Sequence, residues 1–173
     1  MSLSLRGPDA RRWRISVIDG PNMPNLGRRD KGIYGPIKSL DDLQTLVRAF
    51  GDEIGVAVEC FASNHEGAIL DFIHGSAETT DAYIINPAGL TTYGEATRHA
   101  LVDTGRPYVE VHFANTARHF RSVSGDAEPP RSKFTFSATG VVMGLRQYSY
   151  LGALLALSLG LDDAAFLGEG HDG

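Results

Sequence analysis

Short runs of apolar and β-branched residues alternate along the chain with longer segments whose apolar residues recur at helical spacing. The short runs predict strands at 15–18, 56–61, 82–85, 108–111 and 139–143. The longer segments predict helices from residue 40 to before Gly55, and at about 65–74, 94–102 and 147–159. Strands that alternate with helices form a parallel sheet with covered faces. We therefore expect an α/β fold of flavodoxin-like type, a doubly wound five-stranded parallel sheet in the order 2-1-3-4-5.

The same pattern indicates a single domain. It occupies residues 13–161 without an internal repeat or an interdomain linker. Residues 1–12 hold little apolar material, and residues 162–173 follow the last predicted helix, so we expect both segments to be flexible tails. Within the domain, the segment from Gly125 to Lys133 contains two consecutive prolines and predicts a surface loop.

Composition narrows the class of protein and its setting. Of 173 residues, 42% are hydrophobic and 21% are charged, as in soluble globular chains. A formal net charge of −5 argues against nucleic acid as a partner, because proteins that bind it carry a basic surface. The single cysteine, Cys60, excludes an intramolecular disulfide, and the apolar runs are too short to span a membrane. We therefore expect a cytoplasmic protein that does not contact a membrane.

Polar side chains follow the predicted strands where their carboxyl ends meet. The first strand ends at Asp19 to Asn22, the third ends at Asn86, and the fourth carries Glu110 and His112. In open parallel sheets the ligand crevice lies outside the carboxyl ends of the strands. Residues two apart on a strand share a face, so Glu110 can hold the His112 imidazole in one tautomer for acid–base work. The alternative is that the two side chains only satisfy each other at the rim of the sheet.

The segment from Gly27 to Gly35 is too long and too rich in glycine for a tight connection, which suggests a mobile lid. Arg29 and Tyr34 lie on it, and a guanidinium beside a phenol favours the phenolate, so this pair is a candidate base. The alternative is a solvated basic loop with one packing tyrosine.

Several chemistries lack their motifs. The chain has no P-loop and no glycine fingerprint for a dinucleotide. Lysine occurs only at three polar loop positions, which argues against imine chemistry. His65 and Glu66 stand at a predicted helix start, where they either bind a metal or stabilise the helix end. We expect no metal and no organic cofactor.

Taken in order, several motifs closely resemble those of type II 3-dehydroquinate dehydratases. They are Asp-Gly-Pro-Asn at 19–22, Leu-Gly-Arg-Arg at 26–29, Ile-Tyr-Gly at 33–35, Phe-Ala-Ser-Asn-His-Glu-Gly at 61–67, Ile-Asn-Pro at 85–87, Val-Glu-Val-His at 109–112 and Ala-Thr-Gly at 138–140. The resemblance runs from about residue 15 to 159. It implies a flavodoxin-like subunit, commonly assembled as trimers packed into a dodecamer, and a dehydration without a cofactor.

The resemblance also implies catalytic roles for five residues. Tyr34 matches the base that removes the proton alpha to a ketone, and Arg29 matches the arginine that activates it. Asn22 matches the asparagine that positions a water at the enolate. His112 matches the general acid that protonates the departing hydroxyl, and Glu110 matches the carboxylate that orients the acid.

Three further positions match the family's substrate-binding residues. Asn86 matches an asparagine that binds substrate, and Arg121 matches an arginine that contacts ring hydroxyls. Arg118 matches the lid arginine, although about two residues are missing between Asn115 and Phe120.

Three positions depart from the family pattern. Thr92 stands where members usually have histidine, His99 where an aspartate reaches across a subunit interface, and Ala114 where a serine helps to hold the substrate carboxylate. A binding site that hydrogen-bonds a substrate hydroxyl loses much affinity when the protein's polar partner for that hydroxyl is absent.

These departures, together with the retained catalytic residues, lead us to expect a dehydratase that acts on dehydroquinate or a related cyclic hydroxy ketone, with an altered substrate shell. The alternatives are an ordinary shikimate-pathway 3-dehydroquinate dehydratase and a non-catalytic binding paralogue. We expect a homo-oligomer, either a trimer or a dodecamer.

Overall fold

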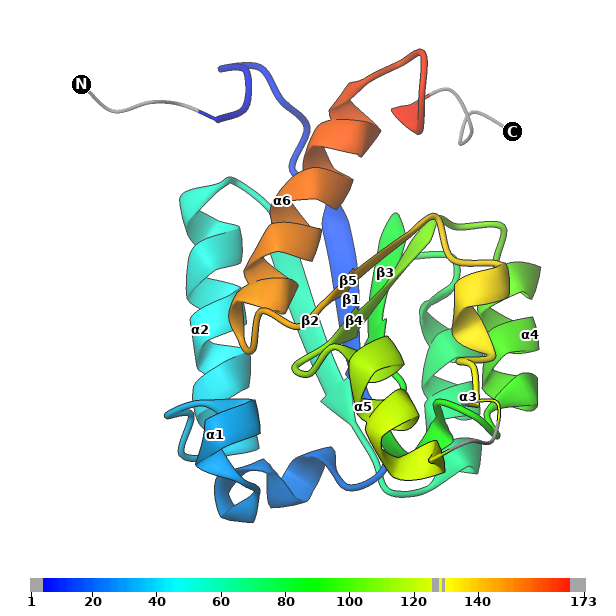
Figure 1. The fold of residues 1–173 in the computed structure, drawn as a ribbon. Helices are drawn as coiled ribbons and strands as arrows, with labels where there is room; N and C mark the ends of the chain where they lie inside the picture. Colours follow the sequence, from blue (N-terminus) through cyan, green and yellow to red (C-terminus); the bar gives the residue numbers. More distant parts are fainter. Residues whose placement is uncertain (1–4, 126–127, 129, 169–173) are drawn as a thin grey trace.

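The computed structural model describes residues 5–125, 128 and 130–168, and its centre is a single parallel sheet (Figure 1). The five strands are β1 (Arg14–Asp19), β2 (Ala57–Ala62), β3 (Ala82–Asn86), β4 (Tyr108–His112) and β5 (Gly140–Met143). All neighbouring strands pair in parallel, in the order β2-β1-β3-β4-β5. The predicted fold and strand order are confirmed.

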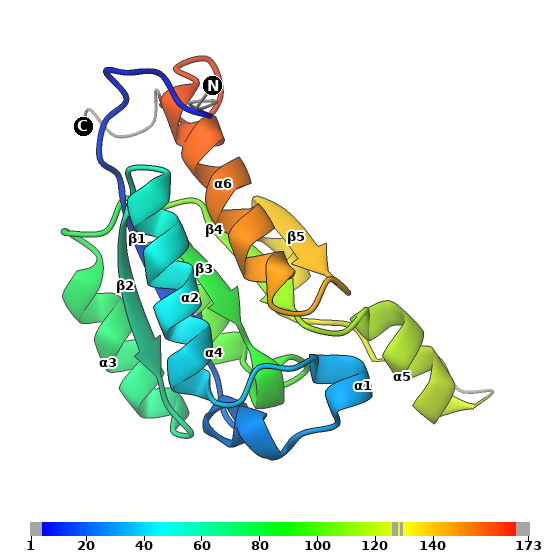
Figure 2. The same cartoon turned by 90° about the vertical axis from the view of Figure 1, so that its left-hand side faces the viewer.

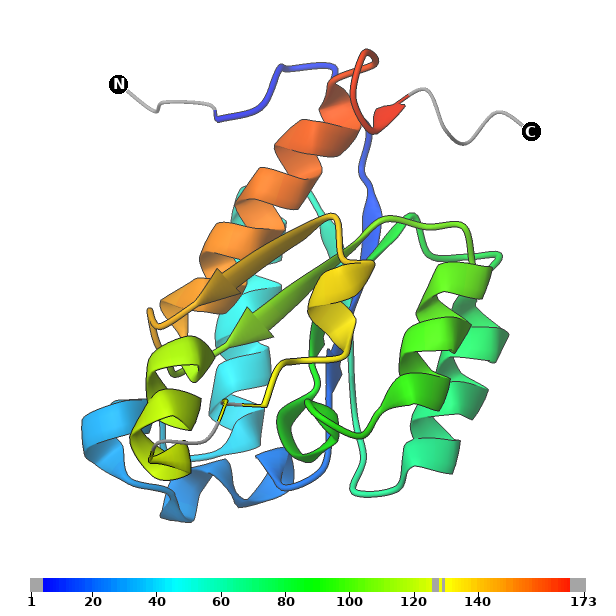
Figure 3. The same ribbon diagram turned by 45° about the vertical axis from the view of Figure 1, so that its right-hand side comes forward.

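Helices cover both faces of the sheet (Figures 1 and 3). Helices α2 (Leu40–Glu53) and α6 (Tyr148–Asp162) cover one face, and α3 (Glu66–Ser76) and α4 (Glu95–Asp103) cover the other. A hydrophobic core lies on each face of the sheet, because successive side chains of a strand point to opposite faces. Ile15 and Val17 pack on the side of α2 and α6. Ile18 and Ile85 point the other way and pack against α3 and α4.

Five short helical segments connect these elements. They are the 3₁₀ helices η1 (Met23–Arg28), η2 (Ala88–Leu90) and η3 (Phe134–Phe136), and the α-helices α1 (Lys31–Tyr34) and α5 (Thr116–Ser124). Most of the predicted lid over residues 27–35 is therefore helical, in η1 and α1. Helix α5 was not predicted. Figure 2 shows α1 and α5 at the same end of the molecule, where the strands terminate.

The segment from Gly125 to Lys133 differs in part from the predicted surface loop. Residues 126, 127 and 129 lie outside the described residues, and Pro130 and Arg131 are exposed. Ser132, however, is only 8% exposed and donates a hydrogen bond to Glu110. Ser132 therefore lies in the domain interior, whereas Lys133 at the end of the segment is exposed.

Parts of the two flanking segments contact the domain. Arg6 is only 7% exposed, and its Nε and Nη2 donate to the Asp162 carboxylate at 2.6 and 2.7 Å. The indole Nε1 of Trp13 donates to the same carboxylate at 2.7 Å. The predicted flexibility of the flanking segments stays a prediction. Within the described part of the chain, no helix is long and apolar enough to cross a membrane.

Candidate active site

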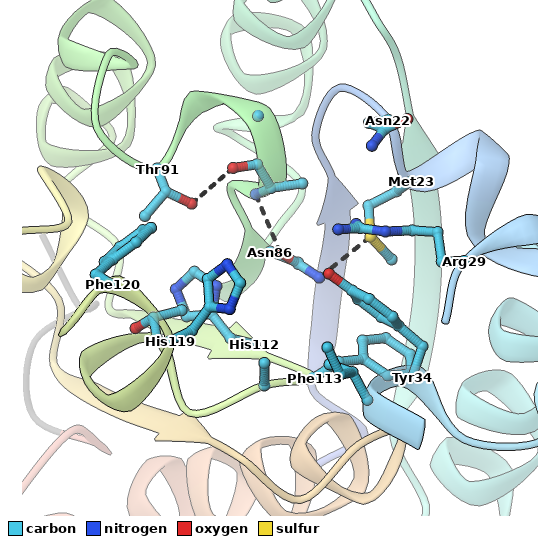
Figure 4. A pocket seen from close by; sticks show the side chains of 15 residues that line it. Asn22, Met23, Arg29, Tyr34, Asn86, Thr91, His112, Phe113, His119 and Phe120 are labelled. Atoms are coloured by element: carbon cyan, nitrogen blue, oxygen red, sulfur yellow. Dashed lines mark hydrogen bonds between the residues drawn. The ribbon is translucent and has the colours of Figure 1, made fainter. Parts of the chain in front are cut away.

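A cavity of about 210 Å³ lies at the carboxyl ends of the strands. Its lining comes from the ends of β3 and β4 and from η1, α1, η2 and α5. Figure 4 shows His112 and His119 on one side of this pocket and Tyr34 and Arg29 on the other, with Asn86 between them. The pocket therefore lies where an open parallel sheet binds its ligands.

Glu110 and His112 form a buried pair at the end of β4. His112 Nε2 lies 2.7 Å from Glu110 Oε1, and the two residues are 5% and 0% exposed. Ser132 and Thr135 also donate to the Glu110 carboxylate, each at 2.5 Å. Burial alone would raise the pKa of Glu110, but the hydrogen bonds from His112, Ser132 and Thr135 outweigh it and hold the pKa below its ordinary value.

This pairing determines how the imidazole can work. An ionised Glu110 only accepts hydrogen bonds, so the nitrogen that faces it, Nε2, carries a proton. The remaining nitrogen of His112, Nδ1, is the atom that gains or releases a proton, and His112 lines the pocket. Such an imidazole can serve a reaction as a general acid or base. The pairing by itself fits both an acid–base role and the alternative that the two side chains only satisfy each other at the rim of the sheet.

Tyr34 and Arg29 line the pocket from α1 and from the residue that follows η1. The Arg29 guanidinium carbon lies 3.9 Å from the centroid of the Tyr34 ring, and both residues are half-buried. The Asp30 side chain caps α1 by accepting from the Gly32 amide at 2.7 Å, and Arg146 donates to the Gly32 carbonyl at 2.9 Å. The guanidinium of Arg29 is therefore held against the Tyr34 ring in a cation–π contact.

Asn22 and Asn86 are brought close by the loops that follow β1 and β3. The Gly20 amide donates to the Asn86 carbonyl at 2.9 Å, and a Cβ on Gly20 would lie only 2.2 Å from the Pro87 carbonyl oxygen. Only glycine allows this approach. Asn22 adopts a left-handed conformation with φ of 75°, which asparagine tolerates better than most residues, and its backbone N–H donates to Asn64 Oδ1 at 2.9 Å.

The pocket of this single chain includes some of the predicted site residues and leaves others out. Asn22, Arg29, Tyr34, Asn86, His112 and Ala114 line it, and Glu110 lies behind His112. Thr92, His99, Arg118 and Arg121 do not line it. His99 is exposed on α4, 3.4 Å from Glu95, and Arg121 lines a neighbouring cavity of about 460 Å³.

Other lining residues were not predicted. Met23, Thr91 and Phe113 are buried beside the predicted residues, and His119 and Phe120 extend from α5. A local signal for α5 exists, because the Asn115 side chain accepts from the Arg118 amide at 3.1 Å and asparagine is a preferred residue at a helix start. Which side of so short a helix faces the pocket depends on the tertiary structure.

His65 and Glu66 have structural roles at the start of α3. The His65 amide donates to the Ser63 hydroxyl at 2.9 Å, and Glu66 Oε1 accepts from the Thr97 hydroxyl at 2.8 Å, which connects α3 to α4. Across the ranges that the structure describes, no group of three or more His, Cys, Asp or Glu side chains is placed to hold a metal ion. Glu66 therefore joins the start of α3 to α4, and the His65 side chain does not cap the helix.

Comparison with known proteins agrees with the fold. The family model "Dehydroquinase class II" matches residues 13–158. A protein named 3-dehydroquinate dehydratase from Desulforudis audaxviator is 40% identical over 77% of this chain and 90% of its own, and one from Thermotoga maritima is 42% identical over 82% and 92%. The crystal structure of type II dehydroquinase from Propionibacterium acnes, with a TM-score of 0.74 and 34% identity, covers 84% of this chain and 96% of its own. The chain therefore belongs to the class II dehydroquinase family and is a carbon–oxygen lyase.

Proposed function

We propose that this protein is a dehydratase that eliminates water from 3-dehydroquinate through an enolate, using only its own side chains. The observation that carries the proposal is the arrangement of two proton-transfer groups in one pocket. The Tyr34 and Arg29 pair lies on one side, and the His112 and Glu110 pair lies on the other. The names of the relatives supply the substrate.

The first step of this mechanism is the removal of a proton. The Tyr34 phenolate takes the proton alpha to the substrate ketone, and the electron pair of the broken C–H bond moves to the ketone oxygen to form an enolate. Arg29 stabilises the phenolate before the transfer, since its guanidinium lies against the ring. Asn22 lines the same pocket and, directly or through an ordered water, donates a hydrogen bond to the enolate oxygen.

The second step expels the hydroxyl group. The enolate electrons return to form the carbon–carbon double bond, the C–O bond breaks, and its electron pair leaves with the oxygen. Protonated His112 gives the Nδ1 proton to that oxygen, so that water departs, and Glu110 holds the imidazole in place. The products are water and a conjugated enone, while Tyr34 keeps the proton that it removed and His112 is left neutral. The site is reset when Tyr34 releases its proton to solvent and His112 takes one up from solvent.

A second candidate substrate rests on one observation in the pocket. Ala114 lines it with a methyl group where the family resemblance implies a serine that helps to hold the substrate carboxylate. A related cyclic hydroxy ketone with fewer or modified polar groups would fit this lining better than 3-dehydroquinate. Thr92 and His99, the other two departures, do not line the pocket of this single chain.

Incubation of the protein with 3-dehydroquinate, followed by the ultraviolet absorbance of the enone product, tests the proposal. We expect turnover within the ordinary enzymatic range of about 1 to 10³ per second. Binding of 3-dehydroquinate without an enone would instead indicate a non-catalytic binding protein. Poor turnover that improves when Thr92→His, His99→Asp and Ala114→Ser are combined would indicate the altered substrate.

A further inference from the structure

Asn86 lines the pocket, but most of its hydrogen bonds go to the protein. Its Nδ2 donates to the Tyr150 hydroxyl at 2.8 Å, and its Oδ1 accepts from the Ala88 amide at 3.1 Å. The second N–H of Nδ2 points to the Met23 sulfur at 3.4 Å, as Figure 4 shows. A thioether is a weak acceptor, so this N–H keeps most of its capacity for a stronger partner in the pocket.

Behind Asn86 the hydrogen bonds continue away from the pocket. The Tyr150 hydroxyl donates to Asp19 Oδ1 at 2.5 Å. Tyr150 is fully buried in α6, and Asp19, at the end of β1, is 1% exposed. Asp19 and Asn86 are direct partners in the register of β1 and β3, and both belong to the face of the sheet that α6 covers. Three elements distant in sequence therefore meet in one chain of hydrogen bonds.

The direction of this chain follows from the chemistry of its members. A phenol has one proton, and Tyr150 gives it to Asp19, so only its lone pairs are left for Asn86. Asn86 must then face Tyr150 with its NH₂ group. The Ala88 amide requires the same orientation, because it needs the carbonyl oxygen of Asn86. Without Asp19, the phenol could donate to Asn86 and stabilise the opposite orientation of the amide.

We propose that Asp19 and Tyr150 are positioning residues that orient the Asn86 amide so that it offers an N–H group to an oxygen of the substrate. The inference rests on the proposed function, because it assumes a substrate with polar oxygens in this pocket. It assigns a purpose to a buried carboxyl group that takes no part in the proton transfers. One oxygen of that group, Oδ2, has no hydrogen-bond partner among the described residues. Such an arrangement is costly if it serves packing alone.

Four single variants test the inference through steady-state kinetics. Tyr150→Phe removes the link, and Asp19→Leu removes the acceptor at similar volume. Each should raise KM by about 10- to 100-fold, the effect of one unmatched hydrogen bond, with a smaller change in kcat. Asp19→Asn retains a carbonyl acceptor and should keep KM near the wild-type value. Tyr83→Phe is the matched control, since its buried hydroxyl bonds to Ser76 in the other core.

A double-variant cycle separates positioning from general stabilisation. If Tyr150 acts through Asn86, adding Tyr150→Phe to Asn86→Ala should raise KM no further than Asn86→Ala alone. If the KM of the double variant rises by the product of the two single effects, Tyr150 acts independently of Asn86, and the inference is wrong. An equal rise of KM in Tyr83→Phe would also overturn it, because any buried phenol would then have the same effect.

Nuclear magnetic resonance gives a readout that needs no substrate. With asparagine labelled by ¹⁵N, the side-chain NH₂ signals of Asn86 are assigned by their loss in Asn86→Ala. Tyr150→Phe and Asp19→Leu should shift these signals and speed their hydrogen exchange, while Asp19→Asn and Tyr83→Phe should leave them in place. Unchanged signals in the first two variants would overturn the inference. If the wild type neither binds nor converts 3-dehydroquinate, the proposed function fails. The Asn86 signals still decide whether Asp19 and Tyr150 orient the Asn86 amide.

Discussion

At the scale of single residues, the two proton-transfer groups of the pocket are held in different ways. His112 is nearly buried on a strand and pairs with a carboxylate that has two further donors. Tyr34 is half-buried on a helix of four residues and lies against the Arg29 guanidinium. The proposed acid, His112, is therefore part of the sheet, while the proposed base, Tyr34, lies on a short helix that has no buried residue. Substitutions at these residues should act mainly on rate rather than on folding.

Replacement of Tyr34 tests the assignment of the base. Tyr34→Phe keeps the ring against Phe113 but removes the phenol oxygen, so kcat should fall by about 10²- to 10⁴-fold, the usual contribution of a general base. Tyr148→Phe serves as the control, because Tyr148 is 60% exposed and does not line the pocket. Enone production slowed to this extent in Tyr34→Phe, with an unchanged unfolding transition, is the expected result. Wild-type turnover by this variant would exclude Tyr34 as the base.

Asp19 predicts an effect of pH on stability. Burial raises the pKa of Asp19 from 3.8 to about 7, although the hydrogen bond from Tyr150 opposes the shift. The folded state therefore holds a proton that the unfolded chain releases between about pH 4 and 7, and Asp19 makes folding less favourable as pH rises through that window. Tyr150, whose own pKa is raised by burial and by Asp19, stays neutral there.

Asp19→Asn removes this titration. Relative to the wild type, the variant should gain free energy of unfolding between pH 4 and 8, by at most about 4 kcal/mol for a shift of this size. Urea unfolding at several pH values measures the difference. Parallel stability curves for the two proteins would show that Asp19 titrates at its ordinary pKa in the folded state.

At the scale of elements, the pocket combines a sheet with several short helical segments. The strand ends supply Asn86 and His112, whereas η1 and α1 supply the Asn22 to Tyr34 side and α5 supplies His119 and Phe120. Helix α5 has no buried residue among those whose side chains are described, so its position depends on its N-terminal cap and on its contacts with the rim of the pocket.

Loss of that cap should therefore affect binding. Asn115→Ala removes the acceptor for the Arg118 amide and should destabilise α5 by about 1 kcal/mol. We expect KM to rise severalfold, because Thr116, His119 and Phe120 move with the helix. Asn115→Asp keeps the cap and should keep KM near the wild-type value. If Asn115→Ala leaves KM unchanged while hydrogen exchange in α5 increases, α5 takes no part in substrate binding.

At the scale of the whole molecule, several large apolar side chains are exposed on the single chain. Tyr93, shortly after η2, is 81% exposed, and Phe136, at the end of η3, is 72% exposed. Exposed apolar groups of this size often mark an interface. We propose that the protein forms a homo-oligomer, a trimer or a dodecamer, in which such groups are covered.

Light scattering at micromolar concentration tests this assembly. The expected mass is three or twelve times that of the 18.6 kDa chain. Tyr93→Glu places a charge in the proposed contact and should lower the mass, whereas the same change at the exposed Leu159 on α6 should leave it unaltered. A wild-type mass of one chain would contradict the proposal.

Much of the architecture could be predicted from local patterns. Residues alternate along each strand and recur along each long helix, so period and turn residues predicted all five strands and the four main helices. The pairing of Glu110 with His112 follows from the same period, because residues two apart on a strand share a face. Helix α1 has only four residues, too few for a periodic signal, and the sequence predicted a loop there. Helix α5 is as long as α4, but its nine residues are mostly polar, and no helix was predicted there.

The sequence by itself determined the family, the order of the strands and six of the fifteen residues that line the pocket, because these depend on local spacing and on motifs within short segments. Only the tertiary structure decided which side chains share the cavity and which do not. It excluded Thr92 and Arg118 from the lining of the single chain and added His119. It also joined Asp19 to Tyr150, 131 positions apart, because strand register and the crossing of α6 over the sheet arise only when the whole chain packs.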